Sequence, residues 1–432
     1  MTGQTYAALD EFTYAIRLDD TLSWPRFNRV LTHVKLHELD KAETDIRYLL
    51  KQDPNSSDAR TLLAALEIQR DDYDNAISNC TLAISLKPSN SRAYFNRAQC
   101  YAMNDDYCRA ISDMDTVINL LTPSPSGFGS CDQLKTGALS GSLHASSISE
   151  QGMFLGILCG STSELAGAYY RRAMYWHDLP DYDRALEDLN KTIDFASCAE
   201  DAPEIFSLRA EIHYRRHHIN QAFLDCNSAL KLDPSHEQAL LLRASLYLDI
   251  DDTTNAMSDC NAVLSLSAAN AKAYAVRAGA LLKQGDLSQA LLDADRALKL
   301  DPHLRVGFSV RGYVLAASGL YESAIQDLTR ALKDHSHAPD PQDVPDFYFR
   351  GLAYYNTHKY PQAFDDLVQA VSLYPESTNS PELPDIYYAL ALASYADGKR
   401  ELALSALHTA IQLRPQFQDA WSMLKLINNA DN

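Results

Sequence analysis

The residues best suited to chemistry are sparse in this chain. His213 and His217 stand four residues apart with His218 beside them, a spacing that could hold a metal ion if a third ligand were supplied. The sequence sets no third ligand there, and we expect a helix end followed by an exposed turn. The phosphate-binding patterns GxGxxG and the Walker loop, the nucleophile elbow GxSxG and the zinc motif HExxH are all absent from the sequence. We therefore predict a protein that is not an enzyme and uses no metal or cofactor.

Composition excludes further classes of protein. The formal charge of −19 argues against a nucleic-acid partner, because phosphate binding needs clustered lysine and arginine. The chain has no apolar run of about 18 residues, so no membrane insertion is expected. The first residues, Met1 to Leu9, lack the basic flank and apolar core of a signal peptide. The eight cysteines contain no CxxC pair, and we expect reduced, mostly buried thiols in a cytoplasmic protein.

A regular spacing of alanines indicates the architecture that must position any functional residue. The gaps between successive members of the series are 34, 34, 75, 37, 34, 34, 34, 39 and 40 residues, for Ala42, Ala76, Ala110, Ala185, Ala222, Ala256, Ala290, Ala324, Ala363 and Ala403. A period of 34 residues is typical of a helix–turn–helix repeat, and the longer gaps indicate insertions. Such repeats bury their apolar faces by stacking on one another, which produces a long surface.

Further positions repeat when the recurring alanine is numbered 20. Position 8 is small in nine of ten repeats and position 4 is often aromatic, which allows two antiparallel helices to approach closely. Position 32 is proline in six repeats, where it ends the second helix. This pattern resembles the tetratricopeptide repeat family over nearly the whole chain. The resemblance implies an all-α fold, an α-α superhelical solenoid of about ten repeats.

The repeats divide the chain into four predicted segments. Residues 1–122 hold the N-terminal repeats, 123–165 a flexible insert rich in serine and glycine, 166–417 the C-terminal repeats, and 418–432 a capping helix. Thr5 to Asp19 fit only a second helix, so we expect an extra N-terminal helix with an open apolar face. Lys425 replaces the small residue at position 8 of the last helix, which blocks further stacking.

Arginine at position 7 and aspartate at position 23 occur together in eight repeats. The pairs are Arg29 with Asp45, Arg97 with Asp113, Arg172 with Asp188, Arg209 with Asp225, Arg243 with Asp259, Arg277 with Asp293, Arg311 with Asp327, and Arg350 with Asp366. The other two repeats have Leu63 with Asn79 and Leu390 with Ala406. Because both partners are lost together, we predict a structural ion pair between the two helices of each repeat. The alternative is a row of arginines that captures acidic ligands.

The resemblance also implies where a partner would bind. In this family the first helices line a concave groove, and positions 2, 5, 6, 9, 12 and 13 tend to face the ligand. Here those positions carry aromatic and polar candidates for partner binding, namely Phe95, Asn96, Tyr170, Arg171, Tyr313, Tyr348, Phe349, Tyr355, Tyr388 and Tyr395. Aromatic side chains concentrate at interaction hot spots, and we prefer those in the C-terminal third.

Three functions remain open. The first is a scaffold that binds peptides or helices of partner proteins in the groove. The second is a heat-shock chaperone adaptor, for which the family's carboxylate clamp retains only Asn96 and Arg171 of five positions. The third is an assembly subunit, or homo-oligomer, joined through the open N-terminal helix. The sequence favours the scaffold.

Overall fold

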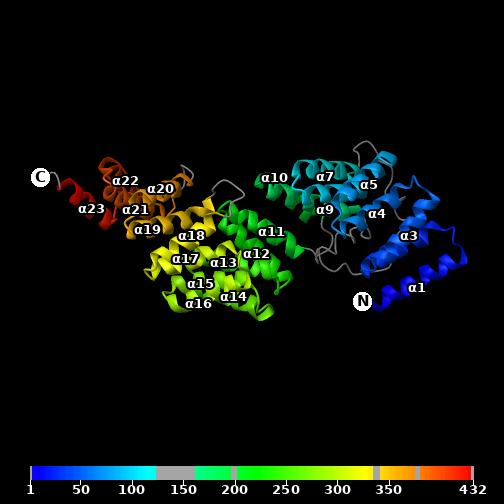
Figure 1. Cartoon of the computed structure of the whole chain (residues 1–432), viewed down its shortest axis with the longest axis horizontal. Coiled ribbons are helices and arrows are strands. Elements are labelled where there is room, and N and C mark those ends of the chain that lie inside the picture. The colour runs from blue at the N-terminus through cyan, green and yellow to red at the C-terminus, as the bar shows by residue number, and fades with distance from the viewer. Residues whose placement is uncertain (1, 123–160, 196–201, 334–340, 375–379, 430–432) are drawn as a thin grey trace. The chain divides into compact units, whose positions relative to one another are not determined.

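The computed structural model describes residues 2–122, 161–195, 202–333, 341–374 and 380–429. Within these ranges the chain forms 22 α-helices and one short 3-10 helix, with no strand (Figure 1). The described helices include none that is long and apolar enough to cross a membrane. The chain divides into two compact units, Met1–His236 and Glu237–Asn432, and five helix pairs lie in each. The predicted all-α repeat architecture is confirmed.

The first unit begins with an unpaired helix, α1 (Thr2–Leu18), which packs on α2. Its five pairs are α2 (Ser23–Lys35) with α3 (Leu39–Gln52), α4 (Ser57–Ile68) with α5 (Tyr73–Leu86), α6 (Ser91–Met103) with α7 (Tyr107–Leu121), α9 (Ser161–Asp178) with α10 (Tyr182–Phe195), and α11 (Ala202–Arg215) with α12 (Ile219–Leu232). These are repeats 1 to 5.

The second unit holds repeats 6 to 10. Its pairs are α13 (Glu237–Asp249) with α14 (Thr253–Leu266), α15 (Ala271–Lys283) with α16 (Leu287–Leu300), α17 (Arg305–Ala317) with α18 (Tyr321–Lys333), α19 (Val344–Asn356) with α20 (Tyr360–Ser372), and α21 (Leu383–Ala396) with α22 (Arg400–Leu413). The 3-10 helix η2 (Pro341–Asp343) precedes α19, and α23 (Gln418–Asn429) packs on α22 at the end of the unit.

Local sequence signals start and stop these helices. An aspartate at position 16 caps the second helix of five repeats by accepting the backbone N–H of the third helical residue, namely Asp72, Asp106, Asp181, Asp252 and Asp286. The residue before it, at position 15, has a positive φ in every repeat. Position 15 is glycine at Gly285, Gly319 and Gly398, but it is His217 (φ 57°) and Asp251 (φ 60°) among the others. The turn between the paired helices therefore requires a left-handed residue.

The core lies between the paired helices, where the small residues were predicted. The alanine at position 20 is fully buried in all ten repeats, and Cys80, Cys226 and Cys260 are fully buried at position 24. Where position 24 is leucine, position 8 can be glycine. A Cβ added to Gly312 would lie 2.6 Å from Cγ of Leu328, so these two helices approach as closely as the side chains allow.

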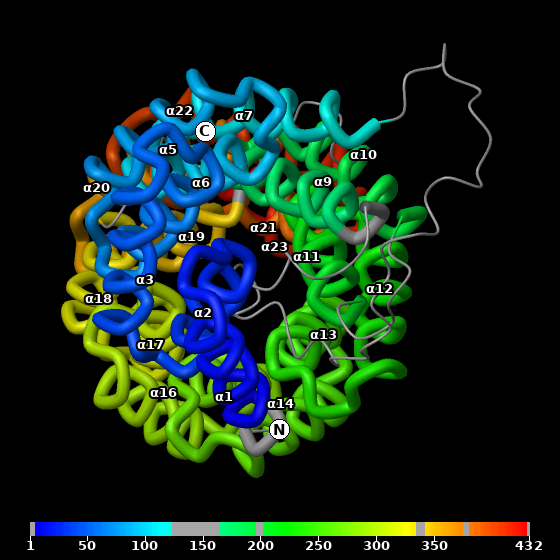
Figure 2. Tube along the Cα trace, turned by 90° about the vertical axis from the view of Figure 1, so that its right-hand side faces the viewer, coloured from blue at the N-terminus to red at the C-terminus, as the bar shows by residue number. Residues whose placement is uncertain are grey.

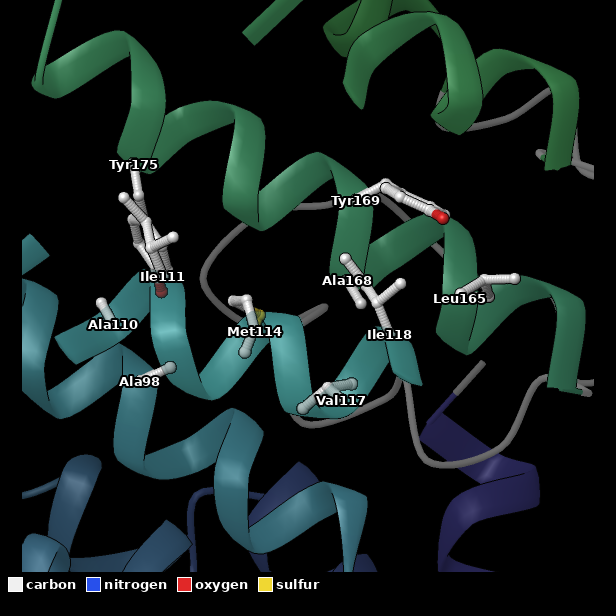
Figure 3. Close-up of a cluster of buried hydrophobic side chains, with 10 residues drawn as sticks. All are labelled: Ala98, Ala110, Ile111, Met114, Val117, Ile118, Leu165, Ala168, Tyr169 and Tyr175. Carbon is white, nitrogen blue, oxygen red and sulfur yellow. The ribbon is translucent and has the colours of Figure 1, made fainter. Parts of the chain in front are cut away.

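The stack continues across the long insertion of the first unit. Helices α7 and α9 pack together directly, and Met114 and Ile118 of α7 share one buried cluster with Leu165 and Tyr169 of α9 (Figure 3). Helix α9 begins at Ser161 and so includes the last five residues of the predicted insert 123–165, whose boundaries stay a prediction. Leu165 is a core residue because it extends the apolar face of α9 by one turn. Residues 123–160 lie outside the described structure.

The first helices of the second unit form a layer of their own. Helices α13, α15, α17, α19 and α21 contact one another in succession as well as their paired second helices. In Figure 2, α19 and α21 lie nearer the axis of the stack than α18, α20 and α22. A stack curves toward the layer in which successive helices lie closest. We call the surface of this layer that faces away from the second helices the first-helix face.

Candidate functional site

Each of the eight arginines at position 7 forms a bidentate salt bridge with the aspartate of its own repeat. In all eight pairs the arginine Nε donates to Oδ2 at 2.6 to 2.8 Å and Nη2 donates to Oδ1 at 2.6 to 3.0 Å. The aspartates are between 2% and 6% exposed. A bidentate pair with a buried carboxylate leaves little of that charge for an acidic ligand. These arginines therefore act as structural residues that join the paired helices.

The third nitrogen of seven of these arginines reaches the helix before their own pair. Nη1 donates to a side-chain oxygen at position 25 of that helix, at 2.5 to 3.4 Å, in Thr13, Thr81, Asp115, Asn190, Asn261, Asp295 and Thr329. Arg172 makes this contact with Asp115 across the insertion. These seven arginines thus connect their own helix pair to the preceding helix, a contact that the sequence analysis missed.

The two repeats without the arginine replace these contacts in different ways. In repeat 2, the Nδ2 of Asn79 donates to both carboxylate oxygens of Glu67 at 2.9 Å. In repeat 10, Leu390 and Ala406 pack in one apolar cluster. The residues at position 25 just before them are Arg47 and Val368, which offer no acceptor oxygen.

Aromatic residues follow one another along the first-helix face of the second unit. The rings of Tyr313 on α17 and Phe349 on α19 lie 4.5 Å apart between centroids, and Tyr348 lies 5.3 Å from Phe349. On α21, the ring of Tyr388 lies 5.1 Å from Phe417, in the loop before α23. All five are partly buried. We call these five residues the aromatic row.

A buried polar cluster fixes one end of the aromatic row. The Tyr313 hydroxyl donates to Asp346 Oδ1, and Ser309 Oγ donates to Oδ2 of the same carboxylate at 3.0 Å. Arg305 Nη2 donates to Asp343 Oδ1 at 2.6 Å. Asp343 and Asp346 are at most 1% exposed, and burial raises the pKa of both Tyr313 and Asp346. Tyr313 is therefore an anchor between α17 and α19 rather than a free contact residue.

The other end of the aromatic row is less constrained. The guanidinium of Arg414 lies 4.9 Å over the Phe417 ring and pairs with Asp385, with Nη2 and Oδ2 2.8 Å apart. Tyr388 makes no hydrogen bond through its hydroxyl among the described residues. Burial raises the pKa of Tyr388, and Asp419 and Tyr355 raise it further. The rings of Tyr388 and Phe417 thus keep some surface that the other described residues do not cover.

Comparisons with known proteins agree with the repeat geometry. A sequence model of the tetratricopeptide repeat family matches residues 27–90, within repeats 1 and 2, and the same helix pair recurs through all ten repeats. Residues 27–90 thus resemble the tetratricopeptide repeat family, and the other helix pairs repeat the same architecture. No curated protein matches its sequence.

Three solved structures resemble this chain at low identity. A tetratricopeptide repeat protein from Parabacteroides merdae is 17% identical, with 62% of this chain and 99% of that chain covered and a TM-score of 0.42. Cut9, in the Cut9–Hcn1 hetero-tetramer of the APC/C, is 15% identical, with 99% and 94% covered and a TM-score of 0.47. Yeast Tom70 is 13% identical, with 95% and 96% covered and a TM-score of 0.37.

The candidates in the first unit are placed differently from those in the aromatic row. Tyr170 is 9% exposed and belongs to a core cluster, so its predicted role in partner binding is corrected to packing. Phe95 packs partly buried against the cluster between α6, α7 and α9. Asn96 Nδ2 donates to the carbonyl of Thr61 at 3.4 Å. Arg171 reaches only the sulfur of Met174, at 3.9 Å, and burial lowers its pKa.

The two clamp residues make no contact with each other in the described structure, and the chaperone clamp stays a prediction. No hydrogen bond or ion pair joins Asn96 to Arg171 among the described residues, and the Asn96 amide is already used. In the second unit, Tyr355 lies 5.7 Å from Tyr360 between ring centroids, and Tyr395 packs against the C-terminal core cluster. Phe417, Asp385 and Arg414 were not predicted as binding residues. Arg414 and Phe417 lie between α22 and α23, at positions that the repeat pattern does not mark.

The histidine group lies at a turn, as expected from the sequence. Helix α11 ends at Arg215, His217 adopts the left-handed conformation, and His218 precedes α12. His213 on α11 faces Asp225, with Nε2 3.9 Å from Oδ2. The three residues therefore belong to the helix end and the turn of repeat 5.

Proposed function

We propose that this protein is a non-enzymatic scaffold whose second unit binds a segment of a partner protein on its first-helix face. The repeat family supports a role in protein–protein interaction. In repeats 8 to 10, the six face positions carry one charged residue, Asp385, although 22% of the chain is charged. Depletion of charge with enrichment of aromatic residues is the composition of interface cores.

The observation that carries this proposal is the aromatic row. Partly exposed aromatic rings that are already held by neighbours lose little conformational freedom on binding, so their further burial contributes to affinity. Tyr313 is held by Asp346, and Phe417 is held between Arg414 and Tyr388. A peptide or helix that covers these rings would gain apolar contact without ordering them.

A cytoplasmic location belongs to this proposal. Four cysteines in the described part of the chain, Cys80, Cys100, Cys108 and Cys260, are free thiols. Burial raises the pKa of Cys80, Cys100 and Cys260, which keeps them as unreactive thiols. Unpaired, buried cysteines are typical of proteins in a reducing compartment.

The proposal is tested by affinity capture from a cell extract with the full chain, read by mass spectrometry. We expect partners captured by the wild type to be lost with Tyr388→Ala combined with Phe417→Ala. The matched control is Tyr6→Ala combined with Tyr14→Ala on α1, which removes two exposed aromatic residues elsewhere. Melting temperatures of both variants are measured alongside. Unchanged capture by the folded Tyr388/Phe417 variant would contradict the proposal.

A second candidate function is supported by the surface of α1. Tyr14, Leu18 and Trp24 are 63%, 71% and 61% exposed, and Trp24 packs edge to face on Phe12. An exposed cluster of this kind is typical of a contact between chains, so an assembly subunit joined through α1 remains the alternative. Sedimentation over a range of protein concentrations distinguishes the scaffold from the assembly subunit. Only the assembly subunit predicts that the mass rises with concentration and that the variant with Tyr6→Ala and Tyr14→Ala stays monomeric.

A further inference from the structure

Acidic side chains lie along the C-terminal part of the aromatic row. Asp385 lies in the first turn of α21, Glu382 immediately precedes that helix, and Asp419 lies in the first turn of α23. Arg414 neutralises Asp385 through two contacts, at 2.8 and 2.9 Å. Glu382 and Asp419 form no ion pair with a basic residue in the described structure. These two acids therefore leave negative charge next to partly exposed rings.

The electrostatic potential of these acids reaches the tyrosines themselves. Burial raises the pKa of Tyr348 to about 12, and the charges of Asp385 and Glu382 contribute to the rise. Asp419 contributes in the same direction at Tyr388. Negative charge at both hydroxyls disfavours an acidic ligand and favours a cation at the same place.

The chain itself already uses this chemistry at several places in the second unit, and two of them lie near its C-terminal end. Arg414 lies over Phe417 while it pairs with Asp385. Lys399 Nζ lies 3.7 Å over the ring of Phe364 and 2.8 Å from Asp397 Oδ2. A cation on an aromatic face is stabilised by the ring quadrupole, and a carboxylate at its edge adds an ion pair.

We infer that this end of the aromatic row selects a partner segment with a lysine or arginine side chain, held on the Tyr388 and Phe417 rings beside Asp419, with Glu382 near Tyr348. The inference rests on the proposed function and adds the chemistry of the partner to it. A second copy of this chain is a poor occupant, because its net charge is −19 and its exposed helix α1 carries Asp10 and Glu11. The apolar face of the segment covers the remaining rings.

The test uses three synthetic 18-residue amphipathic peptides with one leucine and phenylalanine face. Their polar positions are lysine, glutamine or glutamate, and binding to the full chain is followed by fluorescence anisotropy. We expect the lysine peptide to bind about tenfold more tightly than the glutamine peptide, and the glutamate peptide most weakly. Glu382→Gln combined with Asp419→Asn, which keeps the Asp385–Arg414 pair, should remove most of this preference.

A matched control separates the local site from the general negative charge. Glu322→Gln combined with Asp365→Asn removes two exposed acids from the second helices α18 and α20 of the same unit, and it should leave the preference unchanged. Equal binding of the lysine and glutamine peptides to the wild type would overturn this inference while the proposed function stands. An equal loss of preference in both variants would also overturn it. Failure of all three peptides to bind would contradict the proposed function as well.

Discussion

Arg311 joins two repeats through one side chain. Its Nε and Nη2 donate to Asp327 in its own repeat at 2.6 and 3.0 Å, and its Nη1 donates to Asp295 Oδ1 of the preceding repeat at 2.9 Å. The same arrangement recurs with six other arginines at position 7. These hydrogen bonds therefore stabilise each repeat and connect it to the preceding helix.

Removing one partner of an Arg–Asp pair should lower the free energy of unfolding more than replacing both partners. Asp293 is buried and accepts two hydrogen bonds from Arg277. We expect Asp293→Ala to lower the free energy of unfolding by roughly 3 kcal/mol, because it leaves a partly buried guanidinium unpaired. Arg277→Leu combined with Asp293→Leu should cost clearly less, as the apolar pair Leu390 and Ala406 indicates. Urea unfolding measures both, and equal losses would argue against an ion pair within the repeat.

The contact between repeats is weaker, because it is more exposed. Asn261 accepts from Arg277 Nη1 at 2.7 Å. We expect Asn261→Ala to lower the free energy of unfolding by about 0.5–1 kcal/mol. His408 occupies the same position in repeat 10, where the next helix has Leu424 instead of arginine, so His408→Ala is the control and should change little. A loss of the same size in the control would remove the evidence for this contact.

The turn between paired helices offers a stabilising substitution. His217 has a φ of 57°, and three other repeats have glycine at the same position. We expect His217→Gly to raise the free energy of unfolding by about 0.5–1 kcal/mol, since glycine adopts this conformation without steric cost. The reverse change, Gly285→Ala, should lower it by a similar amount. Thermal unfolding measures both variants. A shift of both melting temperatures in the same direction would contradict this explanation of the turn.

One ion pair in the first unit should make stability depend on pH. Asp178 and Glu211 raise the pKa of His177 to about 9, with His177 Nε2 3.7 Å from Glu211 Oε1. A raised pKa means that the folded state holds the proton more tightly, so this contribution is complete below the unfolded pKa of about 6.5 and is lost as the pH rises through about 9. Urea unfolding at intervals from pH 6 to pH 10 should show this decline.

The matched variant isolates the histidine. His177→Gln removes the titrating group, so its stability should change less between pH 6.5 and 9 than that of the wild type. His177 also holds the pKa of Glu211 down to about 2, and that contribution is lost only as the pH falls from about 4.5 through 2. Parallel curves for wild type and variant between pH 6.5 and 9 would show that His177 is not the source.

The sequence predicted what the period determines and missed what loops and neighbours determine. The buried alanines, the turn at His217 and the Arg–Asp pairs all follow from position within the repeat. The second contact of the arginines also has a sequence signal, because an oxygen-bearing residue at position 25 precedes every arginine, while Arg47 and Val368 precede the leucines. That signal lies in the preceding repeat rather than in the repeat that holds the arginine.

The candidate site was predicted only in part, for a physical reason. Face positions say which way a side chain points but not what covers it. Tyr313 is held by Asp346, next to a 3-10 helix that the period does not contain, and Tyr170 is covered by the core of its own repeat. Phe417 stands in a loop, outside the helical period. Tyr388 needed no such neighbour, and its position alone placed it on the face.

The most direct test of the scaffold account is site-specific photo-crosslinking. A photo-reactive phenylalanine analogue is placed in the full chain instead of Tyr388, and in separate proteins instead of Val368 on the second helix α20 or Tyr14 on α1, each exposed to the cell extract. The account predicts a crosslinked partner at position 388 and none at positions 368 and 14. A crosslink at position 14 with none at position 388 would contradict it and place the partner on α1.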